Sequence, residues 1–263
     1  NECAAKVRAS SDIIAIGITG SAGKTSLKEL LGQSLSKICK TTYSKKSFNN
    51  KYGVPVSLFN IGRRDNFGIF EIGMDKKGEI NHLSKIVKPN IGVITNISYA
   101  HSKNFNSLFD IAKAKSEIID NIIENGSIVL NADDKFYNYF KSKAQNRNLK
   151  IISFSRKKKS NIQLSKIKSF KNKSIIKINI NGRSKNFIIK RNLEFYLENI
   201  LASIAVISNY LDLDNISEKI FFNYNLPQGR GDYKYIKIKK KKIHLIDESY
   251  NSNPLSLNFA LNN

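Results

Sequence analysis

The sequence predicts an α/β fold built on a mostly parallel sheet with helices on both faces. Three observations support this prediction. Short apolar runs alternate with amphipathic segments over residues 13–154, as strands and helices do in parallel sheets. A glycine-rich turn joins the first apolar run to the first helical segment. Residues 161–190 instead alternate polar and apolar side chains with a period of two, which predicts a small antiparallel addition.

The predicted elements of the parallel part follow one another closely. An apolar run at residues 13–18 predicts the first strand, and leucines at helical spacing over 27–35 predict the helix after it. From residue 67 onward, strands and helices are expected to alternate, so that helices cover both faces of the sheet. The expected strands are 67–72, 91–97, 127–131 and 150–154, and the expected helices are 79–87, 108–123 and 134–144.

The antiparallel addition is expected to contain a hairpin. Asn181 and Gly182 separate two runs of alternating side chains, and this dipeptide is a strong signal for a two-residue hairpin turn. The chain then returns to a helical period at 193–211, where Leu and Ile side chains form one apolar face. This helix is expected to return the chain to the parallel part of the sheet.

A second domain is expected to begin after a break near residues 226–229. Two strands at 235–238 and 243–246 and a helix from Pro254 would open a Rossmann-like α/β domain. The chain starts at Asn1 rather than Met, and its last residues read as a helix still in progress, so we expect a piece of a longer protein. The expected domains are 1–226 and a truncated 227–263.

Composition limits the class of protein. The chain has 263 residues, of which 41% are hydrophobic and 25% charged, as in folded globular proteins. No apolar run approaches the roughly 20 residues of a membrane-spanning helix. Cys3 and Cys39 are too few for a disulfide framework and suit a reducing compartment. We expect a soluble, cytoplasmic monomer without membrane insertion.

The net charge of +23, from 44 Lys and Arg against 21 Asp and Glu, would usually suggest a polyanionic partner. Here the basic runs at 156–159 and 239–242 lie between short apolar stretches, as solvated turns do. Aromatic residues are not interleaved with these runs as stacking platforms for single strands require. We therefore expect no nucleic-acid partner, although the charge leaves a polyanion-binding patch open as an alternative.

The most specific motif lies where the first strand meets the first helix. Residues 20–25 read Gly-Ser-Ala-Gly-Lys-Thr. Glycines allow N–H groups to surround a phosphate, and the positive end of the next helix adds to that field. Lys24 would neutralise the β- and γ-phosphate oxygens, and the Thr25 hydroxyl would hold a magnesium ion. Ile18 stands where the usual spacing has another glycine, so the loop is a variant in which Gly20 makes the turn.

Residues 19–25 resemble the ATP loop of the Mur ligase family, and further blocks resemble this family in the same order along the chain. The similarity is greatest to the members that add D-alanyl-D-alanine. The blocks are Asn49-Asn50, Gly53-Val54-Pro55, 71–75, Gly78-Glu79-Ile80, Thr95-Asn96-Ile97, Ala100-His101, 112–118, 131–134, Gly229-Arg230 and 247–254.

The resemblance implies an ATP-dependent ligase of peptidoglycan precursor synthesis. Such an enzyme joins D-alanyl-D-alanine to UDP-N-acetylmuramoyl-tripeptide through an acyl phosphate and releases ADP and phosphate. Residues 1–226 would be the central ATP-binding domain and 227–263 the start of the C-terminal domain. The N-terminal domain, which holds the uridine end of the substrate, would be absent, and the fragment alone is expected to be inactive.

The resemblance also implies two magnesium sites. Glu71 ends a strand at the carboxyl edge of the sheet, where open α/β folds bind ligands, and a carboxylate there suits magnesium. His101 matches a ligand of a second ion, and Thr25 a ligand of the first. Lys115, rather than Lys113, matches a lysine that is carbamylated in related ligases, which turns a cation into an anion beside the metals. The implied metal-binding residues are Thr25, Glu71, His101 and Lys115, and the implied catalytic residues are Lys24, His101 and Lys115.

Nucleotide and substrate contacts are implied at further positions. Asn199 matches an asparagine that contacts adenine, Arg230 would reach the phosphates, and Glu248, with Asp247 as the alternative, would contact ribose. The implied ATP-binding set is Thr19, Gly20, Ser21, Ala22, Gly23, Lys24, Thr25, Ser26, Asn199, Arg230 and Glu248. Asn50 would face the substrate pyrophosphate, with Asn49 as the competing register.

The chain departs from the family pattern at two places. Phe195 stands where related ligases usually carry His, which puts part of the adenine pocket in doubt. Ser102 and Lys103 replace the usual Leu-Glu after His101, which reverses a charge beside the implied metal site.

Three other interpretations remain open at this point. A sister ligase, either the one that adds the third residue or a folylpolyglutamate synthase, would share most of these motifs. A nucleic-acid-stimulated NTPase would make use of the +23 charge. A non-catalytic remnant would also retain these motifs, since a central domain alone cannot hold both substrates.

Overall fold

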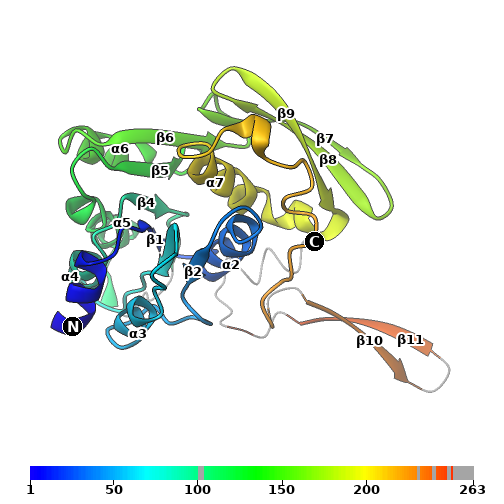
Figure 1. The fold of residues 1–263 in the computed structure, drawn as a ribbon. Helices are drawn as coiled ribbons and strands as arrows, with labels where there is room; N and C mark the ends of the chain where they lie inside the picture. Colours follow the sequence, from blue (N-terminus) through cyan, green and yellow to red (C-terminus); the bar gives the residue numbers. More distant parts are fainter. Residues whose placement is uncertain (100–103, 230–231, 239–240, 248–249, 251–263) are drawn as a thin grey trace.

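The computed structural model describes residues 1–99, 104–229, 232–238, 241–247 and 250, and Figure 1 shows their arrangement. Nine strands form one sheet in the order β2-β3-β1-β4-β5-β6-β7-β8-β9. Pairing is parallel from β2 to β7 and antiparallel between β7, β8 and β9. The strands are β1 (Ile14–Thr19), β2 (Thr41–Tyr43), β3 (Phe67–Glu71), β4 (Ile91–Ile94), β5 (Ser127–Asn131), β6 (Lys150–Ser155), β7 (Ile162–Ser169), β8 (Lys173–Ile180) and β9 (Arg183–Lys190).

Helices cover both faces of this sheet because successive residues of the buried strands point to opposite sides. Ile16 and Ile18 of β1 join the apolar cluster under α2 and α7, whereas Ala15 joins the cluster under the helices of the other face. The helices are α1 (Glu2–Ala9), α2 (Lys24–Leu35), α3 (Gly53–Phe59), α4 (Glu79–Val87), α5 (Leu108–Ser116), α6 (Tyr137–Gln145) and α7 (Leu197–Ile207), with 3-10 turns η2 (Ile119–Asn121), η3 (Arg191–Tyr196) and η4 (Leu213–Asn215). The predicted fold class is therefore confirmed.

Strands β8 and β9 are joined by the predicted hairpin, with Asn181 and Gly182 both at positive φ as a type I′ turn requires. The antiparallel addition continues the main sheet, since β7 pairs in parallel with β6. A separate hairpin, β10 (Asp232–Ile238) and β11 (Lys241–Asp247), contains the two strands predicted after the break (Figure 1). The helix predicted from Pro254 lies outside the described residues.

Three predicted helices are shorter than expected, each because a tertiary contact ends the helical pattern. Helix α5 ends at Ser116 rather than 123, since the next carboxylate, Glu117, accepts from the N–H groups of Gly78 and Asn81. Helix α6 begins at Tyr137 rather than 134, because the Asp134 carboxylate accepts from the N–H of Ile97. Helix α7 spans 197–207 rather than 193–211, and it follows a 3-10 turn whose Glu194 accepts from Ser169 and Ser174.

Strand β4 also ends earlier than predicted, at Ile94 rather than Ile97, because Thr95 and Asn96 turn toward the glycine-rich loop. Helices α1 and α3 and the three-residue strand β2 were not predicted. Within the part of the chain that the structure describes, no helix has both the length and the apolar character to cross a membrane.

Candidate functional site

The glycine-rich loop lies at the carboxyl end of β1 and leads into α2, as predicted. Gly20 has φ of 143°, and a Cβ added there would lie 1.8 Å from Thr95 Oγ1. Gly23 has φ of 81° and caps α2 in the left-handed region. Both positions therefore require glycine, one for close approach and both for backbone conformation. The loop places the N-terminus of α2 at the edge where open α/β sheets bind ligands.

Two residues after β4 hold this loop in shape. Thr95 Oγ1 donates to the Ala22 carbonyl at 2.7 Å, and Asn96 Oδ1 accepts from the Ala22 N–H at 3.0 Å. The Ser21 N–H donates to the Asn96 carbonyl at 2.9 Å. These contacts organise the loop before any ligand is bound, which lowers the entropy lost on binding. Thr95 and Asn96 were not predicted to have a role in the site, although a polar pair directly after a buried strand is a signal that could have indicated one.

The Lys24 side chain folds back over the loop. Its Nζ donates to the Gly20 carbonyl at 2.8 Å and approaches the Ser21 carbonyl at 3.4 Å. A cation held over the loop supplies positive charge next to the N–H groups at the start of α2, and both favour an anion there.

Glu71 and Thr25 meet at the centre of the site. Glu71 ends β3 with 1% of its surface exposed, and Thr25 Oγ1 donates to its Oε2 at 2.8 Å. Asn49 Nδ2 donates to the other oxygen, Oε1, at 2.8 Å. Ser47 Oγ lies 3.3 Å from Thr25 Oγ1, so the loop after β2 closes this side of the site. The carboxylate is thus held in place by residues of two separate segments.

Lys115 is buried on α5 with 1% of its surface exposed. Burial lowers the pKa of its amine well below the ordinary value, and the charge of Lys24 lowers this pKa further. The effect of the Lys24 charge on this pKa indicates that Lys115 lies near Lys24 of the glycine-rich loop. A lysine with a strongly lowered pKa in such a setting is a candidate functional group.

Asn199, near the start of α7, also adjoins the glycine-rich loop. A Cβ added at Gly23 would lie 3.3 Å from Asn199 Oδ1. On the other side of the site, Asn50 Oδ1 accepts from the N–H groups of Tyr52 and Gly53 at the start of α3. The two asparagines predicted for the substrate side therefore differ, since Asn49 contacts Glu71 and Asn50 caps a helix.

Glu198 is a further buried ionisable group at the start of α7. Burial raises the pKa of its carboxyl, and the charges of Asp133 and Asp134 add to this effect. Arg156 and Lys157 lower the same pKa and so oppose the rise. Glu198 could not be predicted from the sequence, because only the fold brings Asp133 and Asp134, after β5, next to α7.

Several predicted site residues lie outside the described residues. These are His101, Arg230 and Glu248, together with Ser102 and Lys103 beside His101. The structure joins Thr25 and Asn49 to Glu71 by hydrogen bonds. Asn199 lies beside Gly23 of the glycine-rich loop, and the charge of Lys24 acts on Lys115.

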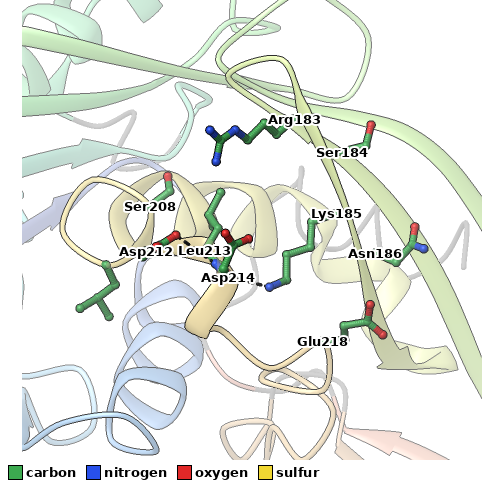
Figure 2. Close-up of a pocket in the computed structure, with 10 residues that line it drawn as sticks. Arg183, Ser184, Lys185, Asn186, Ser208, Asp212, Leu213, Asp214 and Glu218 are labelled. Atoms are coloured by element: carbon green, nitrogen blue, oxygen red, sulfur yellow. Dashed lines mark hydrogen bonds between the residues drawn. The ribbon is translucent and has the colours of Figure 1, made fainter.

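A separate cavity of about 450 Å³ lies between β9, the end of α7 and η4 (Figure 2). Arg183, Lys185, Asp212 and Glu218 are among the residues that line it, and Lys185 Nζ donates to the Leu213 carbonyl. Ser208, another lining residue, is about 13 Å along the helix axis from Asn199 at 1.5 Å per residue. This cavity is therefore at the opposite end of α7 from the glycine-rich loop.

Comparison with known proteins identifies the family. A family model described as the Mur ligase middle domain matches residues 18–207. The chain belongs to the Mur ligase family. The matched residues include the glycine-rich loop, β3 with Glu71, α5 with Lys115 and α7 with Asn199.

Two curated relatives and one solved structure show the degree of similarity. The chain is 35% identical over 94% of its length to a UDP-N-acetylmuramoyl-tripeptide–D-alanyl-D-alanine ligase of Rickettsia prowazekii, and 33% identical over 97% to the one of Buchnera aphidicola. It spans 54% of each of these proteins. The crystal structure of MurF from Acinetobacter baumannii superposes with a TM-score of 0.88 at 28% identity, covering 98% of this chain and 56% of that one. The chain therefore spans about half the length of the relatives it matches.

Proposed function

We propose that this chain belongs to an ATP-dependent ligase that joins D-alanyl-D-alanine to UDP-N-acetylmuramoyl-tripeptide, with release of ADP and phosphate. One observation carries the proposal. The glycine-rich loop, the buried Thr25–Glu71 pair and the buried Lys115 converge on one edge of the sheet. Relatives with this named activity are 33–35% identical over nearly the whole chain. The proposed product is a precursor of peptidoglycan, used in cell-wall growth and division.

The domain arrangement is part of the same proposal. Residues 1–226 would form the central ATP-binding domain, and 227–263 would begin the C-terminal ligase domain. The position of the β10–β11 hairpin after the break at 226–229 supports this division. An N-terminal domain would hold the uridine end of the substrate in the full-length protein. We propose a cytoplasmic monomer, in keeping with free thiols at Cys3 and Cys39.

The residues present fit a magnesium ion. Thr25 and Glu71 offer a hydroxyl and a carboxylate oxygen 2.8 Å apart, and hard oxygen ligands are those that Mg²⁺ prefers. Thr25 and Glu71 would hold one ion, and His101 with a modified Lys115 would hold a second. Bound magnesium would offset negative charge on the phosphates of ATP.

The proposed reaction has two steps. A carboxylate oxygen of the tripeptide attacks the γ-phosphorus of ATP, the bond to ADP breaks, and an acyl phosphate forms. The amine of D-alanyl-D-alanine then attacks the acyl carbon, and phosphate leaves. Lys24 and the N–H groups of the glycine-rich loop would hold the β- and γ-phosphates in line for the first step. Asn199, beside Gly23, would contact the adenine end of the nucleotide.

Lys115 suits a carbamate in this site. Only a neutral amine reacts with carbon dioxide, and burial together with Lys24 favours the neutral form. The product carries a negative charge, so it would relieve the repulsion that a protonated Lys115 would exert on bound cations. This supports the proposal that Lys115 is carbamylated in the active enzyme.

The test is ADP release by the full-length protein with UDP-N-acetylmuramoyl-tripeptide. Release that requires D-alanyl-D-alanine is the expected result. Release with glutamate or a diamino acid instead would assign the chain to a sister ligase, and release driven only by nucleic acid would contradict ligase activity.

Lys24→Ala tests the phosphate role within the same assay. Removal of the loop cation is expected to lower ADP release by at least about 100-fold, since it removes charge stabilisation of the transferred phosphoryl group. Lys37→Ala, two residues beyond the end of α2, is the control and should stay within about twofold. Wild-type turnover by Lys24→Ala would rule out the phosphate-loop assignment.

A further inference from the structure

Lys28 is a completely buried lysine that the proposed chemistry does not use. It lies on α2, one turn after Lys24, and none of its surface is exposed. Its Nζ donates to the Ser44 carbonyl at 2.5 Å and to the Lys46 carbonyl, and forms an ion pair with Glu29 at 2.9 Å. An ammonium group has three donors, and these three contacts match that number. Such burial of a charge is costly, so its partners must be specific.

The carbonyls that Lys28 binds belong to the segment that forms one wall of the site, residues 44–50. Ser47 in this segment contacts Thr25, and Asn49 holds Glu71. Ser44 also contacts the Glu71 backbone, because its Oγ accepts from the Glu71 N–H at 3.4 Å. Lys28 therefore binds the first part of the 44–50 segment, which positions the Glu71 carboxylate.

The backbone of this segment needs such support. Lys46 has φ of 47°, in the left-handed region that is unfavourable for a residue with a Cβ. Its carbonyl is turned toward Lys28 and accepts a hydrogen bond from it. The contact with the buried cation thus stabilises the loop in this left-handed conformation.

We infer that Lys28 is a positioning residue that couples the phosphate-binding helix to the substrate side of the site, through the 44–50 segment. The kinetic consequence of this inference rests on the proposed function, whereas its structural part does not. Lys24 and Thr25 lie in the first turn of α2 and Lys28 lies one turn later, so any shift of α2 toward bound phosphate moves the Lys28 amine and the carbonyls it holds. A change at α2 is thereby passed to Asn49 and Glu71.

Hydrogen–deuterium exchange on this chain tests the structural part without an activity assay. Lys28→Met keeps the volume of the side chain and removes the charge and all donors. Exchange of backbone amides in 44–50 should rise at least about tenfold, while exchange in β1, β4 and β5 stays at the wild-type rate. Lys28→Arg should restore part of the protection. Lys37→Met is the matched control, because Lys37 Nζ also donates to a backbone carbonyl, that of Ile220 at 2.5 Å, but away from this segment.

Three outcomes would overturn the inference. Wild-type exchange in 44–50 for Lys28→Met would show that the segment does not depend on the cation. A uniform rise over the whole sheet would reveal a general loss of stability, and an equal rise in Lys37→Met would remove the specificity. If Lys28→Met does not fold, Lys28→Gln replaces it, since glutamine keeps one amide donor group. Its exchange in 44–50 is then compared with that of the wild type and of Lys37→Met in the same way.

Kinetics of the full-length protein test the coupling. Lys28→Met should raise the KM for the uridine-linked substrate by about tenfold or more, because a charged hydrogen bond is lost. The KM for ATP should change by less than about threefold. Equal effects on both KM values would contradict coupling to the substrate side. If the wild-type protein shows no dipeptide-dependent ADP release, the proposed function fails, whereas the exchange result still decides the role of Lys28.

Discussion

Buried ionisable side chains define this site. Lys28, Glu71 and Lys115 each have at most 1% of their surface exposed, although Lys and Glu are almost never fully buried without partners. Lys28 and Glu71 are held by two or more short contacts. Lys115 differs, because burial and Lys24 favour the neutral form of its amine. The chain therefore accepts an unfavourable burial at Lys115, as enzymes do where a group must react.

Replacement of Lys115 by Met is expected to stabilise the fold. Between the lowered pKa and about 10.4, the unfolded chain binds a proton at this lysine that the folded chain does not, so wild-type stability falls as pH decreases through this window. Met carries no such penalty and should gain about 1–3 kcal/mol in free energy of unfolding at pH 7. Denaturation in bicarbonate-free buffer at pH 7 and pH 10 measures the difference. A gain that does not shrink at pH 10 would contradict the assigned cause.

Replacement of Lys115 by Ala tests the proposed carbamate. The variant should lose ADP release by at least about 100-fold, because the anion that the carbamate supplies is missing. Short carboxylic acids should restore part of the activity by occupying the vacated space with a carboxylate. Lys113→Ala, on the same helix but half a turn away, serves as control and should stay near wild type. Full activity of Lys115→Ala without added acid would remove Lys115 from the reaction.

Secondary-structure elements were predicted with the right boundaries where the local sequence pattern was strong. The predicted helix at 79–87 agrees with α4 in both ends, because its apolar stripe, Gly78 before it and Pro89 after it all indicate the same boundaries. Helices α5, α6 and α7 were overestimated because Glu117, Asp134 and Glu194 bind partners distant in sequence. Such contacts leave no periodic signal. Strand β2 was missed because three residues are too few to show a period.

The end of α4 offers a stability test. Lys88 caps this helix with φ of 41°, and its contacts to Ser84 and Arg8 use only its backbone. Lys88→Gly should therefore raise the free energy of unfolding by about 0.5–1 kcal/mol, since glycine adopts this conformation without strain. Lys85→Gly, in the same helix, should lower it by about 1 kcal/mol. Thermal or urea denaturation measures both, and a loss of stability in Lys88→Gly would show that the left-handed cap is not strained.

The part of the candidate site that belongs to sequence motifs could be predicted. The common location of Lys24, Thr25 and Glu71 could be predicted because a loop sequence and a strand end point to one edge of a parallel sheet. Thr95, Ser47 and Lys28 could not, since their roles depend on which backbone groups the fold presents to them. Asn49 and Asn50 could not be distinguished in sequence, and only the structure separates their contacts.

The whole chain combines a family-specific centre with an unusual charge. The site lies at the carboxyl edge of β1, β3 and β4, on a sheet that matches the Mur ligase middle domain over residues 18–207. In the basic run at 156–159, Lys157 and Lys158 donate their N–H groups to Asp133 and Ser155 as a turn does, and the charges of Arg156 and Lys157 act on Glu198 at the start of α7. That the +23 charge serves no nucleic-acid partner stays a prediction.

The most direct test of ligase chemistry follows the oxygen atoms of the tripeptide. The full-length protein is given ATP, D-alanyl-D-alanine and UDP-N-acetylmuramoyl-tripeptide labelled with ¹⁸O in its reacting carboxylate. Attack of that carboxylate on the γ-phosphorus, followed by attack of the amine on the acyl carbon, transfers one labelled oxygen to each phosphate released. Phosphate that carries one ¹⁸O, formed only when the dipeptide is present, is the predicted result. Unlabelled phosphate would show that water attacks the nucleotide, and it would contradict the proposed ligase.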